Sequence, residues 1–80
     1  MQKALVLLNG IERVKNFNMI TSKRIENVDL QSGRYVIDAK SIMGCFSLNL
    51  SKPVELLFHS EDKDAFKQYL EQIKDYVVKE

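Results

Sequence analysis

The sequence predicts an α+β fold, an open-faced sandwich in which three helices cover one face of a four-stranded antiparallel sheet. Three observations support this. The hydrophobic period switches between that of strands and that of helices, in the order strand, helix, strand, strand, short helix, strand, helix. A Ser-Gly pair separates two consecutive strand-like segments, as in a hairpin. A long apolar stripe in the last predicted helix is suited to cover the sheet.

The first predicted elements are a buried strand and an amphipathic helix. Residues 4–8 form a continuous apolar run that ends at Asn9-Gly10, as is typical of a central strand. From Ile11 onward, apolar residues recur at helical spacing with polar residues between them. The expected core positions of this helix are Val14, Phe17 and Ile20 or Thr21.

A β-hairpin is predicted after the first helix. Residues 28–31 alternate between apolar and polar, which is the period of a half-buried strand. Ser32-Gly33 indicates a tight turn, because glycine readily adopts the positive φ that such turns require. Residues 34–38 are then expected to return as the partner strand.

The second half of the chain predicts a short helix, a strand and a long helix. Ser41 precedes a short apolar segment, so its hydroxyl is expected to cap that helix by accepting a backbone N–H. Residues 54–59 again alternate like a strand. Ser60 is the expected cap of the last helix, whose first turn carries the acids Glu61, Asp62 and Asp64. The apolar stripe of this helix comprises Phe66, Tyr69, Leu70, Ile73, Tyr76 and Val77.

The composition restricts the class of protein. With 45% hydrophobic and 29% charged residues, the chain is too apolar and too evenly charged for intrinsic disorder. No apolar run approaches the roughly 20 residues that span a bilayer. A formal net charge of +1 gives no general attraction to nucleic acid or anionic lipid. We therefore expect a single domain over residues 1–80 that binds neither nucleic acid nor a membrane directly.

Cys45 and His59 are the only residues of their kinds, and this limits the chemistry. One cysteine forms no internal disulfide, and one cysteine with one histidine does not make a zinc site. The N-terminal segment lacks the long apolar region and cleavage site of a signal peptide, so we expect a cytoplasmic protein without a metal or a cofactor. Cys45 is expected to be a small buried residue, and His59 is expected to face solvent or to lie beside the cap of the last helix. Packing also explains the spacing of Tyr35, Tyr69 and Tyr76.

Residues 38–44 resemble a known regulatory segment. They read Asp-Ala-Lys-Ser-Ile-Met-Gly, and they lie between the predicted hairpin and a strand that leads into an acidic-capped helix. This segment, the chain length and the order of elements resemble HPr, the small phosphocarrier family of the bacterial sugar phosphotransferase system. In HPr proteins of Gram-positive bacteria, the serine of this segment is regulatory. The resemblance implies that an HPr-kinase-like enzyme phosphorylates Ser41 and that partners bind at Lys40, Ser41, Ile42 and Met43.

The start of the first helix departs from the same family. HPr proteins carry the phosphoryl group on a histidine in a Gly-Leu-His-x-Arg-Pro-Ala context, whereas this chain reads Gly10-Ile11-Glu12-Arg13. Gly10, Glu12 and Arg13 therefore mark a degenerate phosphocarrier site, in which Arg13 aligns with the family arginine that holds phosphate. Phosphohistidine relay needs an imidazole nitrogen as nucleophile, and no register supplies one here. We expect that the chain is not an enzyme and does not relay phosphate.

Each of these residues also has a plain structural interpretation. A capping role for Ser41 is compatible with its phosphorylation. Glu12 is interpreted first as an acid that stabilises the first helical turn, ahead of the hypothesis that its carboxylate imitates a phosphohistidine. In the short helix we expect a division between partly exposed and inward side chains, the former being Ile42 and Met43 and the latter Phe46 or Leu48.

Three functional hypotheses follow. The first is an HPr-like protein of carbon catabolite regulation that acts by protein contact, similar to the catabolite-repression relative of HPr, which keeps the regulatory serine and lacks the histidine. Its implied partners are an HPr-kinase-like enzyme, a transcriptional regulator of sugar metabolism and proteins of the phosphotransferase system. The second is a phosphocarrier that uses Glu12 or His59 as acceptor. The third is a structural adaptor domain in which neither phosphorylation site is active.

Overall fold

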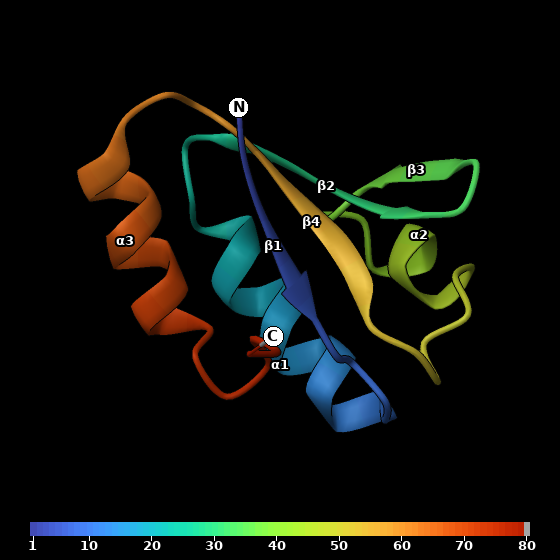
Figure 1. Cartoon of the computed structure of the whole chain (residues 1–80). Helices are drawn as coiled ribbons and strands as arrows, with labels where there is room; N and C mark the ends of the chain where they lie inside the picture. Colours follow the sequence, from blue (N-terminus) through green and yellow to red (C-terminus); the bar gives the residue numbers. More distant parts are fainter. Residues whose placement is uncertain (80) are drawn as a thin grey trace.

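The computed structural model describes residues 1–79, and the elements follow the predicted order (Figure 1). The order of hydrophobic periods along the sequence matches the order of the elements. None of the helices in this part of the chain is long and apolar enough to cross a membrane. The elements are β1 (Gln2–Val6), α1 (Ile11–Ser22), β2 (Asn27–Ser32), β3 (Tyr35–Asp38), α2 (Ile42–Phe46), β4 (Val54–His59) and α3 (Lys63–Gln72).

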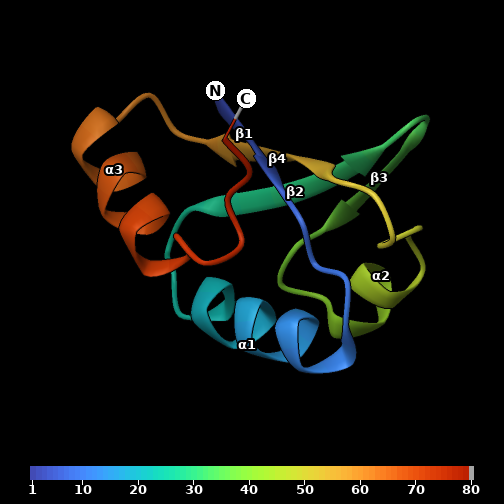
Figure 2. The same ribbon diagram turned by 60° about the horizontal axis from the view of Figure 1, so that its bottom comes forward.

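The four strands form one antiparallel sheet in the order β1-β4-β2-β3, with the helices on one of its faces (Figure 2). Alternate residues of β4 point to the helices, and Leu56 and Phe58 are fully buried there. Leu30 of β2 lies opposite Leu56 in the register and extends the same apolar layer. The predicted α+β open-faced sandwich is confirmed.

Helices α1 and α3 meet through a buried pair of hydroxyl groups. Val14 and Phe17 are buried as predicted, and Thr21 rather than Ile20 completes the buried face of α1. The Thr21 Oγ1 lies 2.6 Å from the Tyr69 Oη, and the Tyr69 ring stacks on Phe58 with the ring centres 5.5 Å apart. Burial raises the pKa of the Tyr69 hydroxyl above its usual range. Both hydroxyls are therefore kept neutral and satisfied inside the core.

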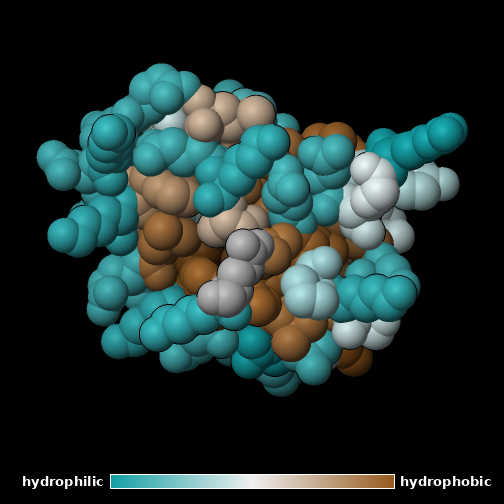
Figure 3. Space-filling view, in the orientation of Figure 1, coloured by the Kyte–Doolittle hydropathy of each residue, from teal (hydrophilic) through white to brown (hydrophobic). Residues whose placement is uncertain are grey.

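The C-terminal residues differ from the sequence prediction, which continued the last helix through Tyr76 and Val77. The helix ends at Gln72, and Val77 instead forms an antiparallel bridge with Val6 of β1. The Leu7 N–H donates to the Tyr76 carbonyl at 2.8 Å, so the edge of β1 gains a backbone partner. Hydrophobic residues gather around this C-terminal segment and polar residues surround them (Figure 3).

Two element boundaries also differ from the prediction. Strand β1 covers Gln2–Val6 rather than residues 4–8, although Leu8 is still fully buried. The cap of α3 is Asp62, whose Oδ1 accepts the Ala65 N–H at 3.0 Å. Ser60 supports this cap from outside the helix by accepting the Asp62 N–H at 3.1 Å. Asp and Ser are equally good caps, so composition alone does not choose between them.

Candidate functional site

Ser41 occupies the start of α2 with an exposed hydroxyl. Its extended backbone (φ −90°, ψ 113°) precedes the helix, and its Oγ accepts the Gly44 N–H at 3.1 Å. This confirms the predicted cap. Gly44 also keeps the serine uncrowded, because a Cβ on residue 44 would lie 3.3 Å from the Ser41 Oγ. The hydroxyl is therefore both fixed by the helix and open to solvent.

The side chains of α2 divide into exposed and buried groups, as predicted. Met43 is 78% exposed and Ile42 packs in part against the core. Leu48, rather than Phe46, is the inward residue, since Phe46 remains 42% exposed. Beneath the helix, burial raises the pKa of the Cys45 thiol to about 11, with a further contribution from the negative charge of Asp38. Cys45 is thus the buried residue that the sequence predicted.

Lys40 is attached to a different part of the chain from Ser41. Its Nζ donates to the Arg24 carbonyl at 2.6 Å, just after the end of α1. Its backbone N–H donates to the Asp38 Oδ1 at 2.9 Å. The ammonium therefore joins the loop before α2 to the loop after α1, where the helix carries its negative dipole end. Sequence reasoning missed this bond, because it joins residues that are far apart in the chain.

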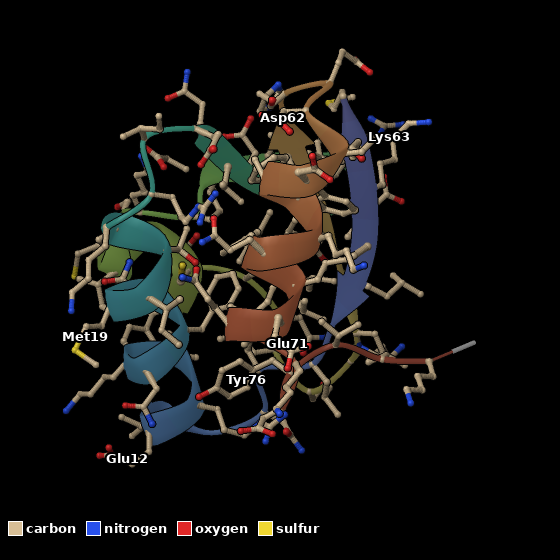
Figure 4. All side chains as sticks on the ribbon, turned by 90° about the vertical axis from the view of Figure 1, so that its left-hand side faces the viewer. Glu12, Met19, Asp62, Lys63, Glu71 and Tyr76 are labelled. Atoms are coloured by element: carbon tan, nitrogen blue, oxygen red, sulfur yellow. The ribbon has the colours of Figure 1, made fainter. Side chains whose placement is uncertain are left out.

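Gly10 and Glu12 lie at the start of α1, and the Arg13 side chain connects this end of the helix to another segment. Gly10 precedes the helix with φ 151°, a conformation that side-chain-bearing residues rarely adopt, and provides no side-chain cap. Glu12 lies exposed in the first turn, at the outer end of α1 (Figure 4). Its position agrees with the plain interpretation as an acid near the positive helix end.

The Arg13 guanidinium connects α1 to the C-terminal segment. Its Nη2 donates to the Leu7 carbonyl at 2.9 Å and to the Asp75 carbonyl at 3.1 Å. It also lies 4.9 Å from the centre of the Tyr76 ring, which Figure 4 shows between α1 and α3. Its Nε is buried without a partner in residues 1–79. The Nη2 of the arginine that was expected to hold phosphate therefore connects two segments of the fold.

His59 lies at the opposite end of the sheet from Gly10. In the register of β1 and β4, Val54 pairs with Val6 near the start of α1, whereas Phe58 pairs with Gln2 at the far end. The His59 Nε2 lies 2.7 Å from the Asp29 Oδ2 on the face of the sheet away from the helices. Sequence reasoning missed this pair, although both residues occupy outward positions of predicted strands.

The Asp29–His59 pair lines a shallow depression on that open face, together with Asn27 and Asp38. Asp29 and Asp38 are directly opposite in the register of β2 and β3. In the part of the chain that the structure describes, no three His, Cys, Asp or Glu side chains are grouped to hold a metal ion. The depression therefore combines two carboxylates and one imidazole without forming a metal centre.

Comparison with known proteins identifies the architecture. No protein-family model matches the sequence, and no curated protein matches it. The crystal structure of HPr-C-His from Thermoanaerobacter tengcongensis is similar, with a TM-score of 0.74. The match covers 94% of this chain and 93% of that chain, and 23% of the residues are identical. The chain therefore has an HPr-like fold.

Proposed function

We propose that this chain is an HPr-like regulator that acts by protein contact, and that phosphorylation of Ser41 controls the contact. One observation carries the proposal: Ser41 presents an exposed hydroxyl at the cap of α2, two residues before Met43, which is 78% exposed. A modifiable group thus lies beside an adaptable apolar side chain. The HPr-like fold, shared with HPr-C-His, supports this choice among the functions that such a surface can serve.

The local geometry around Ser41 favours a phosphate there. The Ser41 Oγ already lies 3.1 Å from the Gly44 N, and the other first-turn amides of a helix have no intrahelical acceptor. A phosphoserine adds about −1.5 to −2 charges and three acceptor oxygens, which these amides can satisfy. Gly44 leaves room for the added group on that side. Lys40 is not needed for charge balance, since its ammonium binds the Arg24 carbonyl.

The start of α1 supports regulation over phosphate relay. Glu12 stands where the resemblance to HPr would require the histidine, so this position offers no imidazole nitrogen to accept a phosphoryl group. The Arg13 Nη2 is bound to two backbone carbonyls. We therefore assign the chain a kinase that resembles HPr kinase and a transcriptional regulator of sugar metabolism as partners. By the same reasoning, we assign the chain a role in protein binding and not in catalysis.

Kinase treatment tests the modification site. The purified chain is incubated with HPr kinase and ATP, and the products are mapped by mass spectrometry. We expect one phosphate on Ser41 and none on the Ser41→Asn variant, which keeps a good helix cap while removing the hydroxyl. Ser47→Ala is the matched control, because Ser47 is also exposed on α2 but caps its other end. An unmodified Ser41, under conditions that modify HPr, would end the proposal.

Partner binding tests the surface. The phosphorylated chain is titrated against the transcriptional repressor that binds serine-phosphorylated HPr. We expect Met43→Asp to weaken binding by about 10-fold or more, because contact residues at the centre of an interface dominate its affinity. Met19→Asp is the matched control, since Met19 is also exposed but lies on α1. Equal binding by both variants would remove Met43 from the surface.

A phosphocarrier function is the second candidate, and the Asp29–His59 pair is the observation that favours it. A carboxylate 2.7 Å from the imidazole orients the ring and leaves its other nitrogen for a phosphoryl group. Incubation with enzyme I and phosphoenolpyruvate, followed by intact-mass measurement, tests His59 and Glu12 together. A phosphorylated product lost in His59→Gln would favour this function. Absence of both modification and binding would leave the adaptor hypothesis.

A further inference from the structure

Strand β3 is an open edge of the sheet. The order β1-β4-β2-β3 places β1 and β3 at the two edges, and Figure 1 shows β3 at the margin of the molecule. The C-terminal segment covers the β1 edge through the Val6–Val77 bridge. By contrast, Tyr35 is 75% exposed and Val36 is 52% exposed on β3, so packing in the core does not explain the position of Tyr35, contrary to the expectation from the sequence. Strand β3 contains no proline or lysine, the residues that commonly protect such edges.

The backbone of β3 presents unpaired groups along this edge. The Ala39 N–H donates to the Val28 carbonyl at 2.8 Å, so this residue directs its backbone groups toward β2. Because these directions alternate along a strand, Tyr35 and Ile37 also bond to β2. The N–H and C=O groups of Val36 and the N–H of Asp38 therefore point outward. They are available to another strand.

We propose that β3 pairs in antiparallel orientation with β3 of a second copy of this chain, about a two-fold axis at Val36. In this register Val36 faces Val36 of the second copy, and their outward N–H and C=O groups bond to each other. Arg34 faces Asp38 of the second copy on one side of the axis, and the reverse pair forms on the other. The two sheets join into one continuous sheet across an isologous interface. This proposal does not depend on the proposed function.

The charges along the β3 edge favour pairing with a second copy of the chain in the antiparallel orientation. The Arg34 guanidinium takes part in none of the ion pairs found among residues 1–79. Asp38 lies directly opposite Asp29 in β2. The antiparallel pairing brings each arginine to an aspartate and offsets the repulsion between those two carboxylates. A parallel pairing would place like charges opposite each other. Of these two orientations, only the antiparallel one brings opposite charges together.

A single edge strand buries little surface, so the dimer is expected to be reversible and weak. Sedimentation equilibrium from about 10 μM to 1 mM covers the affinities at which small interfaces associate. We expect a monomer–dimer equilibrium for the wild type and no larger species, because an isologous interface closes on itself. A chain that stays monomeric at the highest concentration would overturn the proposal.

A charge exchange identifies the register. Arg34→Glu and Asp38→Lys each place like charges opposite each other in a homodimer, so we expect each dissociation constant to rise about 10-fold or more. An equimolar mixture of the two variants restores both opposite-charge pairs and should dimerise like the wild type. Lys52→Glu is the control, since Lys52 is exposed and outside the edge. Circular dichroism confirms that each variant folds. A mixture that stays monomeric would exclude the pairing.

Cross-linking provides a second readout. In Val36→Cys, the two cysteines face each other with Cα atoms about 5.5 Å apart, within reach of a short bismaleimide. Gln31→Cys is the matched control, because Gln31 lies one strand further inside and its two copies are separated by about 14 Å, three strand spacings. The buried Cys45 does not compete. We expect cross-linked dimer only for Val36→Cys, and equal yields for both variants would contradict the register.

Discussion

The Arg13 guanidinium connects α1 to the C-terminal segment. We expect Arg13→Gln, which removes this connection, to lower the free energy of unfolding by about 2–4 kcal/mol. Two hydrogen bonds, of 2.9 and 3.1 Å, join the charged guanidinium to the Leu7 and Asp75 carbonyls. Bonds of this kind contribute about 1.5–3 kcal/mol each, and the Tyr76 ring adds about 0.5–2 kcal/mol. These contributions add to about 3.5–8 kcal/mol, and the expected loss is smaller because the bond to Asp75 is exposed and water replaces it when the guanidinium is removed.

Urea denaturation at neutral pH measures the change. Lys15→Gln is the control, because Lys15 is exposed on the same helix and should change stability by less than about 0.5 kcal/mol. Hydrogen exchange adds a local readout: the Val78 N–H, which bonds to the Leu5 carbonyl at 2.8 Å, should exchange faster in Arg13→Gln. Equal stability of the two variants would refute the structural role and make Arg13 available for phosphate.

Three further predictions concern the core and the caps. Tyr69→Phe and Thr21→Val should each cost about 1–3 kcal/mol, because each leaves a buried hydroxyl unpaired, while the double variant should cost less than the sum in urea denaturation. The pKa of Cys45 is raised to about 11 when folded, against about 8.5 when unfolded. The unfolded chain therefore loses this proton first, and stability measured by denaturation at several pH values should fall from about pH 8.5 upward. Cys45→Ala should lose this slope between about pH 8.5 and 10, above which the Tyr69 hydroxyl, whose pKa burial also raises, contributes a slope in both chains. Asp62→Ala should cost about 1 kcal/mol in thermal unfolding by removing the cap of α3, whereas Asp62→Ser should cost little.

Local features of the fold could be predicted from the sequence because their causes are local. The helical spacing of Val14 and Phe17 alone determines which face of α1 is apolar. The cap at Ser41 depends only on an amide three residues later. Such features need no knowledge of which strands are neighbours, so periodicity and capping chemistry were sufficient.

The missed features depend on contacts between distant residues. Tyr76 and Val77 have helical spacing from Ile73, yet an extended return along β1 also packs them against the core and gives the strand edge a backbone partner. The sequence alone does not show that the β1 edge of the sheet lacks a partner strand. The helical spacing of these residues therefore still predicted a continued helix. The Asp29–His59 pair likewise requires β2 beside β4, an order that hydrophobic period does not reveal.

At the start of α1 the candidate side chain is bound within the fold, whereas at the start of α2 it is exposed. This difference favours regulation over phosphate relay. At α1, the Arg13 Nη2 binds the Leu7 and Asp75 carbonyls, so turning this side chain toward a phosphate would break bonds that stabilise the fold. At α2, the Ser41 hydroxyl and the Met43 side chain are exposed, and their modification disturbs only one capping bond. A phosphate at Ser41 can therefore change the surface without unfolding the domain. A site that alters recognition at little structural cost is what a reversible protein contact requires.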